Sequence, residues 1–320
     1  MQAEVEQSMR ETDLTVSAED GLPLAGTLAL PAGKGPHPAV VLLWAGRLDR
    51  EGSTRQASLG LGRAMAAALA RRGIASYRFD RRGVGATPGE WRAAGFFQHR
   101  DDAAAALRVI AARADVSAAG AVGYSEGALH AAWLGAHAGA AAVVLLGCPA
   151  QRGDEFYLNW ADRLGKDQVP WWLRLVMRPL GRTPREQVAR VNAKLMATTG
   201  DVARVYGFKV PARMCREYLA YDPKPDLAAI GAPVLAITGD NDLSVDHRDL
   251  DVIARLVPDG RAEIRRVAHL THVLRRDPRP ASARSYREQY QRPVDAQLLE
   301  EVAGWLAEKL PPARPAAENE

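Results

Sequence analysis

The sequence predicts an α/β fold, in which helices cover both faces of a mostly parallel central sheet. Three observations support this prediction: short apolar runs recur along the chain, helix-like segments alternate with most of them, and 47% of the 320 residues are hydrophobic. A chain of this length and composition buries one large core, with or without an inserted subdomain.

The first part of the chain contains most of the predicted strands. Residues 14–20 and 22–31 alternate apolar and polar side chains, as the two arms of a β-hairpin do. Continuous apolar runs, typical of strands buried on both faces, follow at 39–46, 74–80, 120–125 and 141–149. Helical spacing of apolar residues, or high alanine content, predicts helices within 54–73, 101–115 and 126–139.

The last part of the chain continues the same alternation. Residues 232–240 and 262–269 predict two more buried strands, and 295–310 carries one apolar stripe typical of a helix docked on a sheet. Functional groups of such a fold collect at the carboxyl ends of its parallel strands.

One region interrupts the pattern and defines the predicted domains. From 151 to 228 there is no clear strand, and Trp160, Trp171 and Trp172 lie in helix-compatible segments broken by prolines. We predict a core formed by 1–150 and 229–310, a helical lid inserted at 151–228, and a disordered tail at 311–320. The alternative is that the inserted helices simply pack on the sheet.

Composition narrows the function classes. The net charge of +4 comes from scattered basic residues, which does not indicate a nucleic-acid partner. Cys148 and Cys215 have no metal-type spacing, so no metal site is expected.

No apolar stretch approaches the roughly 20 residues of a membrane span. The polar opening does not resemble a secretory signal, so the expected location is cytoplasmic. Nothing in the sequence indicates an oligomeric state.

The stretch AVGYSEGALHAAWLG, residues 121–135, places Ser125 between a predicted strand and a predicted helix. This context is typical of a G-x-S-x-G nucleophile elbow, in which Gly123 and Gly127 permit close backbone packing. A serine hydroxyl becomes an effective nucleophile only with a histidine base, an acid that orients the histidine, and amides that stabilise an oxyanion.

The acid and the base are expected after later strands. Asp240, Asp242 and Asp246 follow the strand at 232–240, and His269 and His272 follow the last strand. The order Ser, Asp, His along the chain is the one this arrangement of strands produces. The residues alone leave the choice within each group open.

With these segments the sequence resembles the α/β hydrolases, in particular the esterase and serine aminopeptidase-like branch. The elbow reads GYSEG where that branch commonly has GHSEGG, and FDRRGVGATPG at 79–89 is similar to its D-x-R-G-x-G-x-S loop. The resemblance runs from about 14 to 310 and is weak across the lid. It implies Asp242 as the acid, through G-x-x-D-x-x-V, and His272 as the base.

The resemblance also covers the end of the strand predicted at 39–46 and the loop that follows it. Relatives have His-Gly where this chain has Trp44 and Ala45. The oxyanion donors are therefore expected to be the backbone amides of Glu126 and of Gly46 or Arg47, and Arg47 also has the chemistry to bind an anionic group. The predicted substrate pocket contains the aromatic residues Trp44, Tyr124, Trp160, Trp171 and Trp172.

Together these features predict a serine hydrolase that cleaves a small carboxylic ester or thioester through an acyl-enzyme, with no metal or organic cofactor. Two alternatives stay open. The same triad serves acyl transferases, biosynthetic cyclases or thioesterases, and peptidases. If the changed loop at Trp44 abolishes the oxyanion site, the protein is a noncatalytic binding module.

Overall fold

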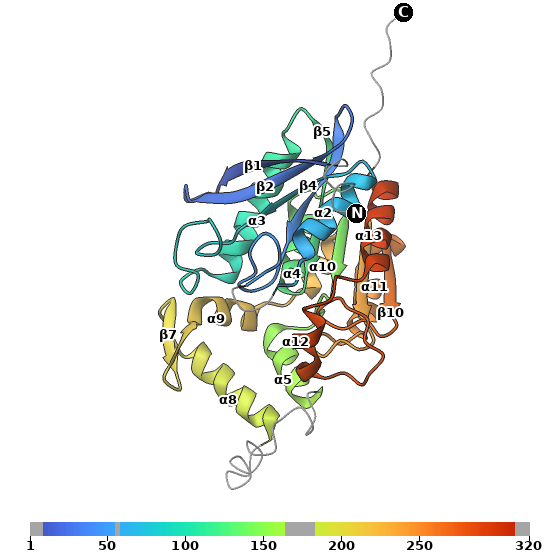
Figure 1. The fold of residues 1–320 in the computed structure, drawn as a ribbon. Helices are drawn as coiled ribbons and strands as arrows, with labels where there is room; N and C mark the ends of the chain where they lie inside the picture. Colours follow the sequence, from blue (N-terminus) through green and yellow to red (C-terminus); the bar gives the residue numbers. More distant parts are fainter. Residues whose placement is uncertain (1–8, 55–57, 164–182, 311–320) are drawn as a thin grey trace, which may run out of the picture.

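An eight-stranded sheet forms the centre of the computed structural model, which describes residues 9–54, 58–163 and 183–310 (Figure 1). The strand order is β1-β2-β4-β3-β5-β6-β9-β10. β2 is antiparallel to both β1 and β4, and all other neighbouring strands are parallel. The predicted α/β fold is confirmed. The strands are β1 (Met9–Ser17), β2 (Pro23–Pro31), β3 (His37–Leu43), β4 (Ala75–Phe79), β5 (Val116–Tyr124), β6 (Val143–Leu146), β9 (Val234–Gly239) and β10 (Ala262–Val267).

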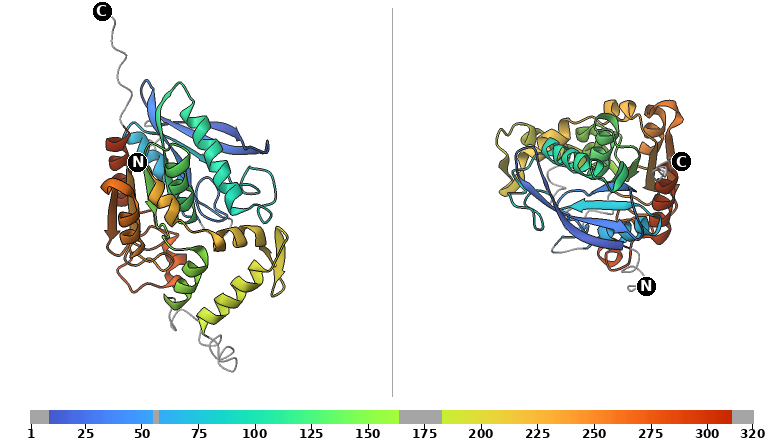
Figure 2. Two further views of the ribbon diagram at one scale, coloured as in Figure 1. Left: turned by 180° about the vertical axis from the view of Figure 1, so that it is seen from behind. Right: turned by 90° about the horizontal axis from the view of Figure 1, so that it is seen from above.

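Helices cover both faces of this sheet (Figure 2). One face carries α2 (Leu61–Arg71) and α13 (Ala296–Lys309); the other carries α3 (Phe96–Ala111), α4 (Glu126–His137), α10 (Lys224–Ala229) and α11 (Asp249–Leu256). Alternate residues of a strand face opposite sides, and here both sides are covered. This is why the central strands read as continuous apolar runs.

The elements differ from the sequence prediction mainly at their ends. β1 begins at Met9, five residues before the predicted start, and α3 begins at Phe96 instead of 101. The helix predicted within 54–73 begins only at Leu61, because Gly60 adopts a left-handed φ of 63°. α11 was not predicted at all.

A cap, defined here as residues 151–163 and 183–220, is inserted between β6 and β9 and lies beyond the carboxyl ends of the parallel strands (Figure 1). Its elements are α5 (Gly153–Arg163), α8 (Pro184–Met196), β7 (Val202–Val205), β8 (Phe208–Pro211) and α9 (Ala212–Ala220).

The cap departs from the helical lid expected at 151–228 in two ways. It contains the hairpin β7–β8, whose two turn residues Tyr206 and Gly207 both have positive φ, as a tight type I′ hairpin turn requires. The predicted boundary at 228 also falls inside α10, which packs on the core helices α4 and α11. Trp171, Trp172 and the tail at 311–320 lie outside the described residues.

Three short helical turns complete the described chain: η2 (Pro258–Gly260), η3 (Ala283–Ser285) and α12 (Tyr286–Gln289). Among the described residues, no helix is both long and apolar enough to span a membrane.

Candidate active site

Ser125 lies at the sharp turn between β5 and α4, at the carboxyl end of the sheet. Its φ of 56° and ψ of −119° are strained for a residue with a side chain. A Cβ on Gly123 would lie 2.3 Å from the carbonyl oxygen of Gly127, and one on Gly127 would lie 2.2 Å from that of Leu43. Close backbone packing therefore requires both glycines, as the G-x-S-x-G motif predicts.

Asp242 and His272 form a hydrogen-bonded pair next to this turn. The Nδ1 atom of His272 lies 2.9 Å from Oδ2 of Asp242, whose other oxygen accepts the backbone N–H groups of Ser244 and Val245 at 2.7 and 2.9 Å. The Asp242 side chain is only 3% exposed. Because Nδ1 donates to the carboxylate, the neutral ring has its lone pair on Nε2, as a general base needs.

The competing acid and base candidates have other contacts. Asp240 is exposed, and its carboxylate accepts the backbone N–H of His269 at 2.7 Å. Asp246 forms an ion pair with Arg163 at 3.1 Å. His269 is exposed and occupies a left-handed turn position with φ of 60°. The geometry therefore favours Asp242 and His272 over Asp240, Asp246 and His269.

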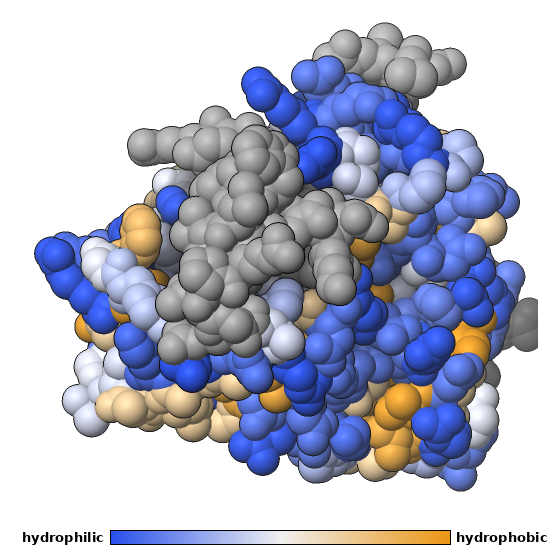
Figure 3. All heavy atoms as spheres, turned by 90° about the horizontal axis from the view of Figure 1, so that it is seen from below, coloured by the Kyte–Doolittle hydropathy of each residue, from blue (hydrophilic) through white to orange (hydrophobic). Residues whose placement is uncertain are grey.

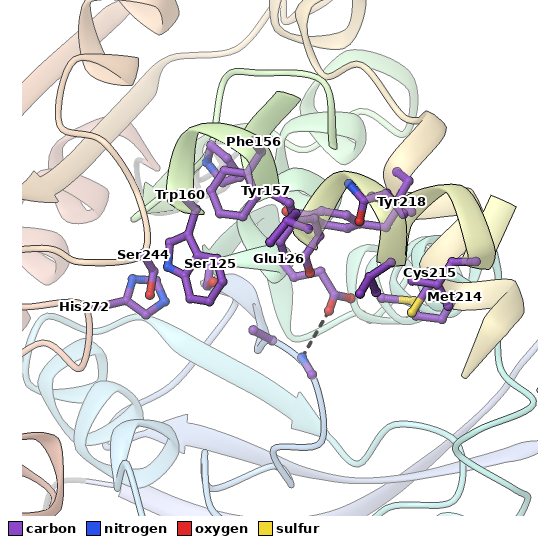
Figure 4. A pocket seen from close by; sticks show the side chains of 18 residues that line it. Ser125, Glu126, Phe156, Tyr157, Trp160, Met214, Cys215, Tyr218, Ser244 and His272 are labelled. Carbon is purple, nitrogen blue, oxygen red and sulfur yellow. Dashed lines mark hydrogen bonds between the residues drawn. The ribbon is translucent and has the colours of Figure 1, made fainter. Parts of the chain in front are cut away.

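Ser125 and His272 both line a cavity of about 550 Å³ between the elbow and the cap (Figure 4). Most of the remaining wall is apolar and comes from α5, α8 and α9. In contrast, the outer surface at this end of the molecule is mostly hydrophilic, with smaller hydrophobic patches between (Figure 3). The apolar and aromatic lining residues of the cap are Phe156, Tyr157, Trp160, Val188, Val191, Leu195, Met214, Tyr218 and Leu219.

Of the aromatic residues expected in the pocket, the structure places Trp160 in the cavity wall but not Trp44 or Tyr124. Trp44 is buried, and its Nε1 donates to the carbonyl of Arg50 at 2.9 Å. Tyr124 is buried beneath His272, and its hydroxyl donates to the His272 carbonyl oxygen at 2.9 Å. Both side chains pack on the face of the sheet that carries α2 and α13, so the expectation for these two residues is corrected.

The expected oxyanion donors lie in two loops that meet at the elbow. The N–H of Gly46, which lines the cavity, donates to Oε2 of Glu126 at 3.2 Å. Within the described ranges, the backbone N–H groups of Glu126 and Arg47 donate to no protein acceptor. The guanidinium of Arg47 lies 4.1 Å from the ring centre of Trp91. These contacts favour the amides of Glu126 and Arg47 over that of Gly46 as the expected oxyanion donors.

Sequence reasoning missed two features of the site. Gly147, which follows β6 and has φ of 56°, lies directly under the acid–base pair: a Cβ there would be 3.5 Å from Asp242 Oδ2 and 3.6 Å from the His272 ring. The aromatic residues Tyr157 and Tyr218 also line the cavity. Helical spacing within α5 and α9 carried a signal for these tyrosines, because residues on one helix face share one environment.

Comparisons with known proteins show which family and which folds this chain resembles. A family model described as serine aminopeptidase, S33 matches residues 56–279. No curated protein matches the chain in sequence. An esterase from Pyrococcus furiosus is similar in fold, with 14% identity and a TM-score of 0.63 over 97% of this chain and 95% of that one. Est1E of Butyrivibrio proteoclasticus with ferulic acid bound has 16% identity and a TM-score of 0.60 over 90% of this chain and 97% of its own. A proline iminopeptidase from Mycobacterium smegmatis has 14% identity and a TM-score of 0.61 over 93% of this chain and 98% of its own.

Proposed function

Because the chain belongs to the serine aminopeptidase S33 family of α/β hydrolases, we propose that it is a serine-dependent hydrolase of apolar carboxylic esters or thioesters. The observation that carries the proposal is that one cavity is lined by an elbow serine, by a histidine already hydrogen-bonded to a buried aspartate, and by an apolar cap.

In the proposed reaction, Ser125 Oγ attacks the substrate carbonyl carbon while its proton passes to Nε2 of His272. Asp242 stabilises the resulting imidazolium through Nδ1. The amide of Glu126 and an amide of the Gly46–Arg47 segment stabilise the oxyanion. His272 then gives the proton to the leaving oxygen or sulfur, which leaves an acyl-enzyme. A water molecule, deprotonated by His272, releases the acid and regenerates Ser125.

The cavity supports an apolar acyl group as the substrate moiety. Its wall is aliphatic and aromatic, and its volume of about 550 Å³ lies in the range of small-molecule sites. The similar folds of an esterase and of a protein solved with ferulic acid are compatible with this class. The family description and the proline iminopeptidase fold favour short peptides as the second candidate substrate class.

The test is turnover of p-nitrophenyl esters of increasing acyl length, with proline p-nitroanilide as the peptide probe. We expect Ser125→Ala to lower kcat for the esters by about a thousandfold or more. Ser244→Ala is the matched control, because Ser244 also lines the cavity but its hydroxyl takes no part in the proposed reaction. Retention of most of the activity by Ser125→Ala would exclude the proposed nucleophile.

The same assay tests the acid and the base. His272→Ala is expected to lose activity while His269→Ala keeps it, and Asp242→Asn is expected to lose activity while Asp240→Asn keeps it. The opposite pattern in either pair would reassign that residue.

A further inference from the structure

Two ionised side chains beside the elbow have no role in the mechanism above. Arg81 comes from the loop after β4, and Glu126 is the first residue of α4. Nη2 of Arg81 donates to Oε1 of Glu126 at 2.6 Å, and the two side chains are 8% and 12% exposed. Glu126 matches the glutamate of the GHSEGG elbow, whereas Arg81 occupies the x position of D-x-R-G.

The pair holds both polar backbone groups of Gly46. Its N–H donates to Oε2 of Glu126 at 3.2 Å, the contact drawn dashed in Figure 4, and its carbonyl accepts from Nη1 of Arg81 at 2.9 Å. Gly46 itself has a left-handed φ of 59°. One ion pair thus links the segments that follow β3, β4 and β5, and those after β3 and β5 carry the expected oxyanion amides.

The charge on Glu126 needs a compensating cation at this place. Burial opposes ionisation of the Glu126 carboxyl, but the attraction of Arg81 and the contact with His130 outweigh it and hold its pKa well below the usual range. The Nε2 atom of His130 lies 3.3 Å from Oε1 of Glu126, yet burial lowers the pKa of His130, so this ring is neutral near pH 7. Arg81 is consequently the cation that faces Glu126. Without it, a carboxylate next to the nucleophile opposes negative charge on the substrate oxygen.

We propose that the Arg81–Glu126 pair is a positioning device for the oxyanion site. Glu126 holds the Gly46 segment so that the neighbouring amide points at the reacting oxygen, and Arg81 neutralises the carboxylate so that it does not repel the oxyanion. The inference rests on the proposed acyl-enzyme mechanism and goes beyond it, because it assigns side-chain roles to residues outside the triad and the backbone amides.

A double-mutant cycle tests the electrostatic half of this proposal. For each variant, kcat and KM are measured with a p-nitrophenyl ester, and the rate of Ser125 phosphonylation is measured with a fluorophosphonate. We expect Arg81→Met to lower kcat and the phosphonylation rate by about tenfold or more, with KM changed less than about twofold. Adding Glu126→Gln to Arg81→Met removes the uncompensated charge and is expected to restore most of the lost rate.

The positioning half is tested with variants that keep Arg81. These variants can therefore decide the proposal even if Arg81→Met does not fold. Glutamine at 126 still accepts the Gly46 N–H, whereas alanine does not. We therefore expect kcat of Glu126→Ala to fall about fivefold or more below that of Glu126→Gln. The matched control is Asp102→Asn, which breaks the buried ion pair of the adjacent Arg82 (2.6 Å) and is expected to lower the melting temperature but not kcat.

The outcomes separate this inference from the proposed function. If the wild-type protein is not phosphonylated at Ser125, both fail. If it is phosphonylated but Arg81→Met reacts at the wild-type rate, or Glu126→Gln gives no recovery in that background, the electrostatic role is wrong. Equal kcat for Glu126→Ala and Glu126→Gln overturns the positioning role.

Discussion

Tyr124 stands where relatives often have histidine, and the structure gives it a contact on the proposed base. Its hydroxyl donates to the carbonyl of His272 at 2.9 Å, and its ring centre lies 5.2 Å from that of the imidazole. The tyrosine thereby fixes the loop that carries His272. We infer that it orients the proposed base, since it does not line the cavity.

Removal of this hydroxyl tests that role. Tyr124→Phe leaves the His272 carbonyl without its donor, at a cost of about 1 kcal/mol, so we expect kcat to fall about fivefold with little change in KM. Tyr77→Phe is the matched control, because the Tyr77 hydroxyl makes a similar bond to the carbonyl of Leu14 at 3.1 Å, remote from the cavity. Equal kcat values for the two variants would contradict the assignment.

At the scale of single residues, the sequence indicated candidate site residues more clearly than the side chains that surround them. Ser125 was identified by its motif, but spacing alone did not separate Asp242 from Asp240, because both lie in the same turn. The family pattern chose Asp242, and the hydrogen bond to His272 favours the same choice. Trp44 was misplaced because the pocket expectation ignored the alternation of side chains at a strand end, which directs it away from the cavity.

At the scale of elements, the close contact between β3 and the elbow predicts a strong effect of one methyl group. A Cβ on Gly127 would lie 2.2 Å from the Leu43 carbonyl oxygen, and neither backbone segment can move without disturbing the sheet. We expect Gly127→Ala to lower the free energy of unfolding by about 2 kcal/mol or more and to reduce activity.

The matched control lies in α13. A Cβ on Gly304 meets no atom within 4 Å, so Gly304→Ala is expected to stabilise the protein by about 0.5–1 kcal/mol. Urea unfolding of both variants measures these changes. Equal destabilisation by the two substitutions would show that the contact at the elbow is not the cause.

Element types were predictable where periodicity was strong, whereas element ends were predictable only where a turn signal marks them. α4 begins and α13 ends within a residue of the prediction, because both boundaries coincide with a turn signal. The β7–β8 hairpin escaped prediction because its turn, Tyr206-Gly207, lacks the usual Asn-Gly or Asp-Gly signature. Its strands are only four residues long, too short for a clear alternation.

At the scale of the whole molecule, two buried histidines couple stability to pH. Burial lowers the pKa of His99, which belongs to α3, and that of His130, which belongs to α4. In the unfolded chain these rings take up protons below about pH 6.5, whereas in the folded protein they resist protonation. The unfolded state thus binds more protons, and folding stability decreases as pH falls below about 6.5.

The measurement is the urea midpoint between pH 7.5 and 5.5. Each neutral buried histidine contributes a loss of up to about 1.4 kcal/mol per pH unit in the lower part of this range. His99→Phe removes one of the two groups, so we expect a clearly shallower pH dependence for this variant. An unchanged dependence would mean that other groups control acid stability.

The proposed substrate cavity is formed jointly by the core, which supplies Ser125 and His272, and the cap, which supplies most of the apolar wall. Its dimensions therefore depend on how α8 lies over the elbow, which no local pattern in the sequence encodes. For the same reason we expect the chain-length preference of the enzyme to change through a cap residue that has no role in the proposed reaction. Val191, in the middle of α8, is such a residue.

Val191→Phe tests this dependence. The larger ring occupies part of the 550 Å³ cavity, so we expect kcat/KM for long-chain p-nitrophenyl esters to fall about tenfold or more, while that for the acetate ester changes less than about twofold. Met196→Phe, at a position of the same helix that is 47% exposed, is the control and should leave the chain-length profile unchanged. A uniform loss across all esters for Val191→Phe would instead indicate that α8 positions the catalytic residues and does not select the acyl group.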